Sequence, residues 1–207
     1  MRTSAGWIAS AAAAVLVAAG AITYAVAADD GGTGGSVPAA DSADAGFARD
    51  MAVHHQQAVE MAYIVRDRTT DEEVRRLAYD IAQTQANQRG MLLGWLDLWG
   101  LPKVSSDAPM TWMGMGDMAG GKDGALMPGM ATDTELKKLG TLNGKQAEVF
   151  FLQLMTAHHK GGIHMAEGCV ARCTVGVEKR LAQGMVDAQE SEIALMADML
   201  KARGAKA

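Results

Sequence analysis

The feature that most constrains the fold is an internal repeat. When the sequence is shifted by 104 residues, it aligns with itself without a gap over about 45 residues. In this register the two Met-x-x-His-His motifs coincide, and so do four further pairs: Phe47 and Phe151, Met61 and Met165, Leu77 and Leu181, Gln85 and Gln189. One register held over this length indicates a duplication. The chain is therefore expected to contain the same helical unit twice.

Each copy is expected to form a hairpin of two helices. In the first copy, the apolar pattern favours helices over about 45–68 and 70–99, and the Gly-Leu-Pro that follows ends the second of them. The second copy repeats this pattern within 132–203. Four long amphipathic helices in two hairpins predict an all-α domain, 45–203, folded as a four-helix bundle.

Threonines are the candidate caps where these helices begin. Thr70 is followed three residues later by Glu73, a spacing that predicts a capping box for the second helix. Thr174 is its counterpart in the second copy. Thr132 and Glu135 predict a further capping box at the start of a short helix that precedes the second copy.

Residues 1–28 are expected to be a targeting segment. After a basic start, the stretch from Trp7 to Ala28 carries no charge, and Ala25-Val26-Ala27 resembles a signal peptidase site. The apolar run is about 20 residues long, which is close to the length that spans a bilayer, so a cleaved signal peptide and an uncleaved membrane anchor both stay open. Residues 29–44 predict a flexible linker, and the rest is expected outside the cytoplasm.

The candidate functional residues form two stripes of methionine and histidine on the first helix of each copy. The first stripe consists of Met51, His54, His55 and Met61, and the second consists of Met155, His158, His159 and Met165. At 100° per residue each set shares one helix face. Imidazoles and thioethers one turn apart favour copper, with Cu(I) preferred and Cu(II) possible, whereas zinc would require cysteine or carboxylate ligands. The alternative is that both stripes pack the core.

Polar residues interrupt the apolar seam of the second helix in each copy. These are Gln85 and Gln88 in the first copy, and Gln189 and Glu192 in the second. An unpaired buried polar group costs roughly 1–3 kcal/mol, so these residues need partners. They are candidates to orient the imidazoles, while bonds to backbone or to one another are the alternative. The fifth histidine, His164, is expected on a solvated face, and a peripheral metal site with Glu167 is the alternative.

Residues 103–131 form a long Gly-rich segment between the copies, here called the methionine segment. It carries six of the 15 methionines: Met110, Met113, Met115, Met118, Met127 and Met130. Loops of this length are uncommon and are usually functional or disordered. Thioethers on mobile backbone predict a Cu(I) collector, and a disordered linker is the alternative.

The only two cysteines, Cys169 and Cys173, are four residues apart. On a helix they would face the same way, one turn apart. In an oxidising compartment this spacing favours a local disulfide. A thiol pair that binds Cu(I) is the alternative.

Three features together resemble a known family, domain-of-unknown-function family 305 (DUF305). They are the paired Met-x-x-His-His motifs, the Gln-x-x-Glu-Ile at 189–193 and the Met-Pro-Gly-Met at 127–130. The resemblance covers about 45–201. It implies an exported, ferritin-like four-helix bundle, and some members bind copper in the periplasm and support copper tolerance. It also implies that the eight stripe residues are ligands, with the methionine segment as an addition. Gln88 departs from the pattern, because Glu192 stands at its place in the second copy.

These observations favour an extracytoplasmic copper buffer or chaperone that is not an enzyme. A ferritin-like di-metal oxidase is less favoured, because the chain has no Glu-x-x-His motif and the stripes carry no acid. A third reading is an envelope interaction or structural module that binds no metal. The formal charge of −5 argues against a nucleic-acid partner. A homodimer, a copper-transport partner and membrane contact through an uncleaved anchor stay open.

Overall fold

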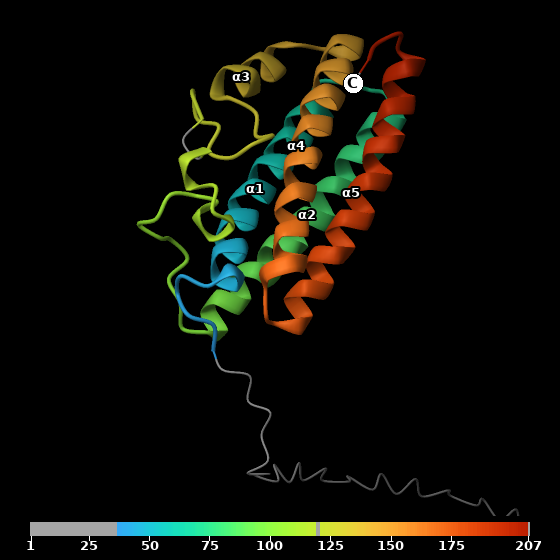
Figure 1. The fold of residues 1–207 in the computed structure, drawn as a ribbon. Coiled ribbons are helices and arrows are strands. Elements are labelled where there is room, and N and C mark those ends of the chain that lie inside the picture. The colour runs from blue at the N-terminus through green and yellow to red at the C-terminus, as the bar shows by residue number, and fades with distance from the viewer. Residues whose placement is uncertain (1–36, 119–120, 207) are drawn as a thin grey trace, which may run out of the picture. The chain divides into compact units, whose positions relative to one another are not determined.

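The fold is that of a computed structural model, which describes residues 37–118 and 121–206. The helices in these residues are, in chain order, α1 Ala43–Arg66, α2 Glu72–Leu98, the 3-10 turns η1 Thr111–Met113 and η2 Gly116–Met118, α3 Asp133–Thr141, α4 Gly144–Arg172 and α5 Gly176–Ala202. One hairpin is α1 with α2, the other is α4 with α5, and the two pack together through α1 and α4 (Figure 1). The predicted all-α four-helix bundle is confirmed.

The duplication is visible in the helix bounds. Helix α5 begins and ends 104 residues after α2, so the second helices of the two hairpins have the same length. The short helix α3 lies before the second hairpin and packs against both α1 and α4. In Figure 1, α1 and α4 run in opposite directions along their shared interface.

The capping prediction is correct for α3 and wrong by one residue for α2. The Thr132 side chain and the Glu135 side chain form the predicted capping box at the start of α3. Helix α2 is capped by Asp71 instead of Thr70, because the Asp71 carboxylate accepts the Val74 amide at 3.0 Å. Aspartate is at least as good a cap as threonine, and here it is one position nearer the helix.

Thr174 does not cap α5, contrary to the prediction. The residue before the helix is Val175, which has no side-chain cap. Instead, the carboxylate of Asp44 in α1 accepts the backbone amides of Thr174 at 2.8 Å and Val175 at 2.7 Å. The amides at and just before the start of a helix have no intrahelical partners, and here a side chain from the other hairpin accepts two of them.

The core consists of two clusters of buried apolar side chains. The Phe151 cluster includes Leu139 of α3 and lies along the half of the bundle that α3 covers. The Phe47 cluster includes Leu96 of α2 and residues of the methionine segment. Each methionine–histidine stripe has one of its methionines in each cluster, so the histidines lie between the two.

The described part of the methionine segment packs on the bundle, which corrects the prediction of mobile backbone. Asp50 of α1 accepts hydrogen bonds from the Met110 amide at 2.7 Å and from Nε1–H of Trp112 at 2.8 Å. Further along α1, the Gln57 side chain pairs with both the N–H and the C=O of Ala131. The segment therefore follows α1, as the yellow-green part of Figure 1 shows.

Among the described residues, no helix combines the length and apolar character needed to cross a membrane. The predicted signal peptide or anchor, residues 1–28, lies outside the described residues. The predicted linker, residues 29–44, is described from residue 37 on, and its last two residues already belong to α1.

Candidate metal centre

Four buried histidines meet between α1 and α4. His54 and His55 come from α1, His158 and His159 come from α4, and all four are 0% exposed. The rings of His54 and His158 stack, with their centroids 3.7 Å apart and their planes 29° from parallel. Since these two residues are counterparts in the repeat, the duplication brings equivalent side chains into contact.

Hydrogen bonds fix the free ring nitrogen of both α4 histidines. Nε2–H of His158 donates to the carbonyl oxygen of His54 at 3.1 Å. Nε2–H of His159 donates to the carboxylate of Glu192 in α5 at 2.6 Å. In a neutral imidazole with a proton on Nε2, the lone pair that can bind a metal is on Nδ1. His158 and His159 therefore both offer Nδ1.

Within the described residues, the group contains six ring nitrogens without a hydrogen-bond partner. They are both nitrogens of His54, both nitrogens of His55, Nδ1 of His158 and Nδ1 of His159. A buried polar atom left without a partner costs roughly 1–3 kcal/mol. Packing alone leaves this cost uncompensated, whereas a metal ion would take up the lone pair of one nitrogen on each ring. The donor set therefore fits a metal.

Burial keeps the imidazoles of His54, His55 and His158 neutral. Desolvation lowers the pKa of His54 and of His158 well below the usual 6.5, and the neighbouring imidazoles lower both further. Desolvation also lowers the pKa of His55 to about 3, and the nearby Gln88 side chain opposes this shift. The neutral imidazole is the form that binds metals, so these rings need not lose a proton first.

The second helices of the two hairpins place different polar groups beside the histidines. Glu192 contacts His159, the arrangement predicted for a residue that orients an imidazole. Its repeat counterpart Gln88 lies near His55. Gln85 and Gln189 are buried, and the Oε1 atom of each has no partner in the described residues. The repeat is therefore symmetric in shape but not in charge.

The stripe methionines lie on both sides of the histidines, and all four are 0% exposed. Met51 and Met165 belong to the Phe47 cluster. Met61 and Met155 belong to the Phe151 cluster. Because α1 and α4 are antiparallel, the start of each stripe lies with the end of the other. All eight predicted residues thus line one interface.

The methionine segment adds thioethers at one end of that interface. Five of its methionines lie within the Phe47 cluster or pack against it: Met110, Met113, Met115, Met127 and Met130. The side chain of Met118 lies outside what the structure describes. The segment therefore extends the end of the stripes that holds Met51 and Met165, a placement the sequence did not predict.

His164 contacts the methionine segment from the surface of α4. Its Nε2 atom lies 3.3 Å from Sδ of Met115. His164 is exposed, as its position on the helix predicted. The contact with Met115 was not predicted, because nothing in the local sequence indicates where the segment docks.

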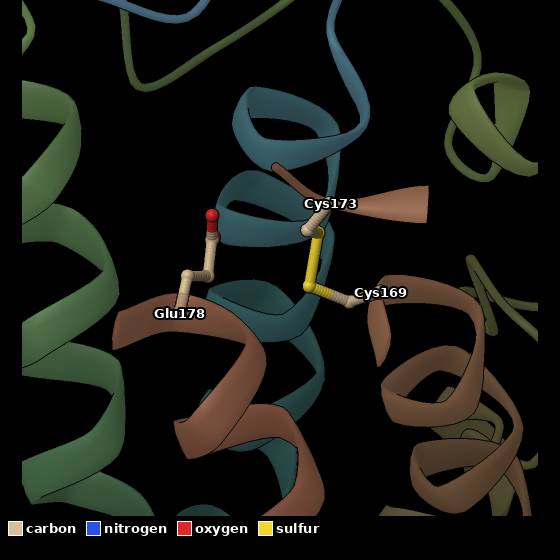
Figure 2. Close-up of side chains that lie close together, drawn as sticks. All are labelled: Cys169, Cys173 and Glu178. Carbon is tan, nitrogen blue, oxygen red and sulfur yellow. A yellow bond between two sulfur atoms is a disulfide. The ribbon is translucent and has the colours of Figure 1, made fainter. Parts of the chain in front are cut away.

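A disulfide joins Cys169 and Cys173 at the end of α4 (Figure 2). Sequence reasoning missed the third member of this group, Glu178, which lies in the first turn of α5 and is 0% exposed. Burial, together with the nearby Asp44 carboxylate, raises the pKa of Glu178 to about 9. Val74 is the repeat counterpart of Glu178, so an acid at an apolar repeat position was the available signal.

Comparisons with known proteins identify similar chains. The family model described as Domain of unknown function (DUF305) matches residues 44–200. The crystal structure of a protein described as a secreted DUF305 protein from Streptomyces coelicolor is 80% identical, with a TM-score of 0.76 over 81% of this chain and 98% of that chain. A DUF305 fragment from Deinococcus radiodurans is 30% identical, with a TM-score of 0.62 over 76% of this chain and 94% of that chain. No curated protein matches this chain.

The fold is also similar to that of CopM in its Cu(I)-bound form. CopM is 22% identical to this chain, with a TM-score of 0.59. The similarity covers 76% of this chain and 95% of that chain. At this level of identity the comparison shows a shared fold.

Proposed function

The chain belongs to the DUF305 family, and from this premise we propose that it binds copper ions as a buffer or chaperone outside the cytoplasm. One observation carries the proposal: six buried ring nitrogens of four adjacent histidines have no hydrogen-bond partner in the part of the chain that the structure describes. Imidazole nitrogen and thioether sulfur are both copper ligands, and thioether favours Cu(I). The Cu(I)-bound form of CopM, which has this fold, supports the same reading.

The histidines and the stripe methionines would hold copper in complementary ways. His158 and His159 supply Nδ1, because Nε2 of each is already engaged. His54 has both ring nitrogens free and stacks against His158. A pair of thioethers lies beyond the imidazoles at each end, Met51 with Met165 at one and Met61 with Met155 at the other.

The donor types favour copper over zinc or iron. The stripes contain no thiolate and no carboxylate. Glu192 accepts its hydrogen bond from His159, and a carboxylate in that position raises the basicity of the imidazole. Ferritin-like oxidases hold two metal ions with four helix carboxylates, and the histidines here are not matched by such a set.

A binding role suits the closed core better than catalysis. All four histidines are 0% exposed, so a substrate would have no direct path to them. Storage or delivery requires only that copper enters and leaves when α1 and α4 separate locally. Location outside the cytoplasm is supported by the secreted relative and by the disulfide, which is typical of oxidising compartments.

The proposal is tested by titrating Cu(I) against a coloured chelator that competes for it. Glutamine replaces all four core histidines in one variant, and His164→Gln, which changes the one exposed histidine, is the matched control. We expect the fourfold variant to lose tight Cu(I) binding while its circular dichroism stays helical. The control should bind as the native protein does. If the native protein, the fourfold variant and the control bind Cu(I) equally, the four core histidines are not copper ligands.

A metal-free interaction module is the second candidate, and it has an observation of its own. His158 and His159 are hydrogen-bonded within the protein, and His54 stacks on His158, as residues used in packing would be. Under this reading the native protein would compete no better for Cu(I) than the fourfold variant. It would also lose stability when the histidines are replaced.

A further inference from the structure

The group at the end of α4 has the composition of a metal site. Cys169 is in the last turns of α4, Cys173 follows its end, and Glu178 approaches from the first turn of α5. The two sulfur atoms and a carboxylate oxygen all lie within 4.8 Å of one another. Figure 2 shows the Glu178 side chain standing beside the disulfide. None of these residues belongs to the methionine–histidine stripes.

Glu178 is an independent indication that this group has a role in binding as well as in packing. It is 0% exposed, and in the described residues its carboxyl group has only the nearby Asp44 carboxylate beside it as a polar neighbour that shifts its pKa. The nearby Asp44 carboxylate is itself used by the amides of Thr174 and Val175. A buried carboxyl whose polar neighbour is another carboxyl is costly to ionise, and a bound cation would compensate that cost.

The repeat supplies an internal control for what the fold needs at these positions. The counterparts of Cys169, Cys173 and Glu178 in the first hairpin are Val65, Thr69 and Val74. The two valines are 0% exposed and Thr69 is 7% exposed, so they fill the equivalent space at the other end of the bundle. The first hairpin therefore closes its end without a disulfide and with no acid at the position of Glu178, while Thr69 bonds the buried Glu148 at 2.6 Å. Only the second hairpin places two cysteines and an acid at these three positions.

We propose that reduction of the Cys169–Cys173 disulfide opens a Zn²⁺ site formed by the two thiolates and the Glu178 carboxylate. A dithiol reductant supplies two electrons and two protons, becomes a disulfide itself, and leaves two thiols in the protein. Zn²⁺ then binds as the thiol protons and the Glu178 proton leave for solvent. A water molecule completes the four ligands.

The donor types and their spacing match zinc. Zinc takes cysteine sulfur at about 2.3 Å and carboxylate oxygen at about 2.1 Å, so ligand atoms on one ion lie about 4 Å apart. The present separation, within 4.8 Å, needs only small movements once the sulfur atoms part. Two thiolates and two neighbouring carboxylates, Glu178 and Asp44, also favour a divalent cation over a monovalent one. The site is thus closed by oxidation and opened by reduction, independently of copper in the histidine core.

The test uses Co²⁺ as a probe for Zn²⁺ on the full chain, before and after reduction with a dithiol that is then removed without air. A thiolate ligand gives cobalt an intense charge-transfer absorption, which histidine ligands do not give. We expect this band in the reduced protein and not in the oxidised one, and we expect Zn²⁺ to displace it. The variant without the four core histidines should keep the band, which separates this site from the copper site.

The repeat suggests the variants. Each one replaces a residue of the second hairpin with its counterpart from the first hairpin, where the bundle already accommodates that side chain. Glu178→Val should weaken Co²⁺ affinity by roughly tenfold or more. Cys169→Val with Cys173→Thr should abolish the band while the protein stays helical. A reduced native protein that loses its helices, or that stays helical and gives no thiolate band, overturns the proposal. Unchanged affinity in Glu178→Val removes the carboxylate from the site and overturns it equally.

Discussion

His159 donates a hydrogen bond to Glu192 across 2.6 Å, and this contact breaks the symmetry of the repeat. On the equivalent turn of the first hairpin, His55 lies near Gln88 instead. The two halves of the candidate metal centre therefore have the same shape but differ by one negative charge. The imidazole that binds the carboxylate is the better electron donor and has a fixed orientation.

Glu192→Gln should reduce copper affinity by roughly 10–100-fold. The glutamine amide orients the His159 ring less firmly, and it lacks the negative charge that makes the imidazole a better electron donor. Chelator competition with Cu(I) measures the change. Glu190→Gln, which alters an exposed acid two residues away, is the control and should bind as the native protein does. Equal affinities in both variants would mean that His159 is not a ligand.

A double variant, Met51→Leu with Met165→Leu, should show whether these two methionines bind copper through their sulfur atoms or only pack the core. Leucine has nearly the volume of methionine, so each change should cost less than about 1.5 kcal/mol in the free energy of unfolding. Copper affinity should nevertheless fall, since both sulfur atoms at one end of the stripes are gone. Met196→Leu, in the Phe151 cluster, is a matched control for packing. Loss of stability without loss of affinity would assign these methionines to the core alone.

The metal-free protein should lose stability in acid. The pKa values of His54, His55 and His158 are lowered in the fold, so the unfolded chain takes up their protons first as the pH falls below 6.5. Each histidine then removes up to about 1.4 kcal/mol of stability per pH unit. Urea unfolding between about pH 7 and pH 5 measures the slope. His164→Gln should leave it unchanged, and a flat profile would contradict the buried neutral state.

Glu178→Gln should stabilise the oxidised protein at neutral and mildly alkaline pH, by about 1–3 kcal/mol. The pKa of Glu178 is raised from 4.5 to about 9, so its contribution is complete below pH 4.5 and is lost as the pH rises through about 9. Glutamine has no proton to lose, and the variant should lack this decline. Unfolding curves of both proteins near pH 5 and pH 8 give the comparison, and parallel pH profiles would count against a protonated Glu178.

Asp50→Ala should release the methionine segment from α1. The Met110 amide and the Trp112 indole lose their shared acceptor, at a cost of about 1–3 kcal/mol. We expect faster proteolytic cleavage within 103–131 and faster hydrogen exchange at the Met110 amide, with little change in α5. Asp187→Ala, whose exposed carboxylate accepts a hydrogen bond from Gln183 on α5, is the control. Unchanged protease resistance would show that other contacts hold the segment.

Much of this fold could be predicted because the relevant interactions are local or repeated. The 3.6-residue period places Met51, His54 and His55 on one face whatever packs against it. The capping box at Thr132 and Glu135 uses backbone atoms within four residues. The start of α2 was misplaced because Thr70 and Asp71 are both good caps, and only the backbone geometry selects Asp71.

The sequence by itself determined the class of fold, its duplication and the helix faces that carry sulfur and imidazole. Periodicity and internal repetition depend only on the order of residues. Only the tertiary structure decided which ring nitrogens are free, because His54 and Glu192 reach their partners from other helices. It also decided that Glu178 stands beside the disulfide. These are contacts between residues distant in sequence, and their geometry depends on how helices pack rather than on any local pattern.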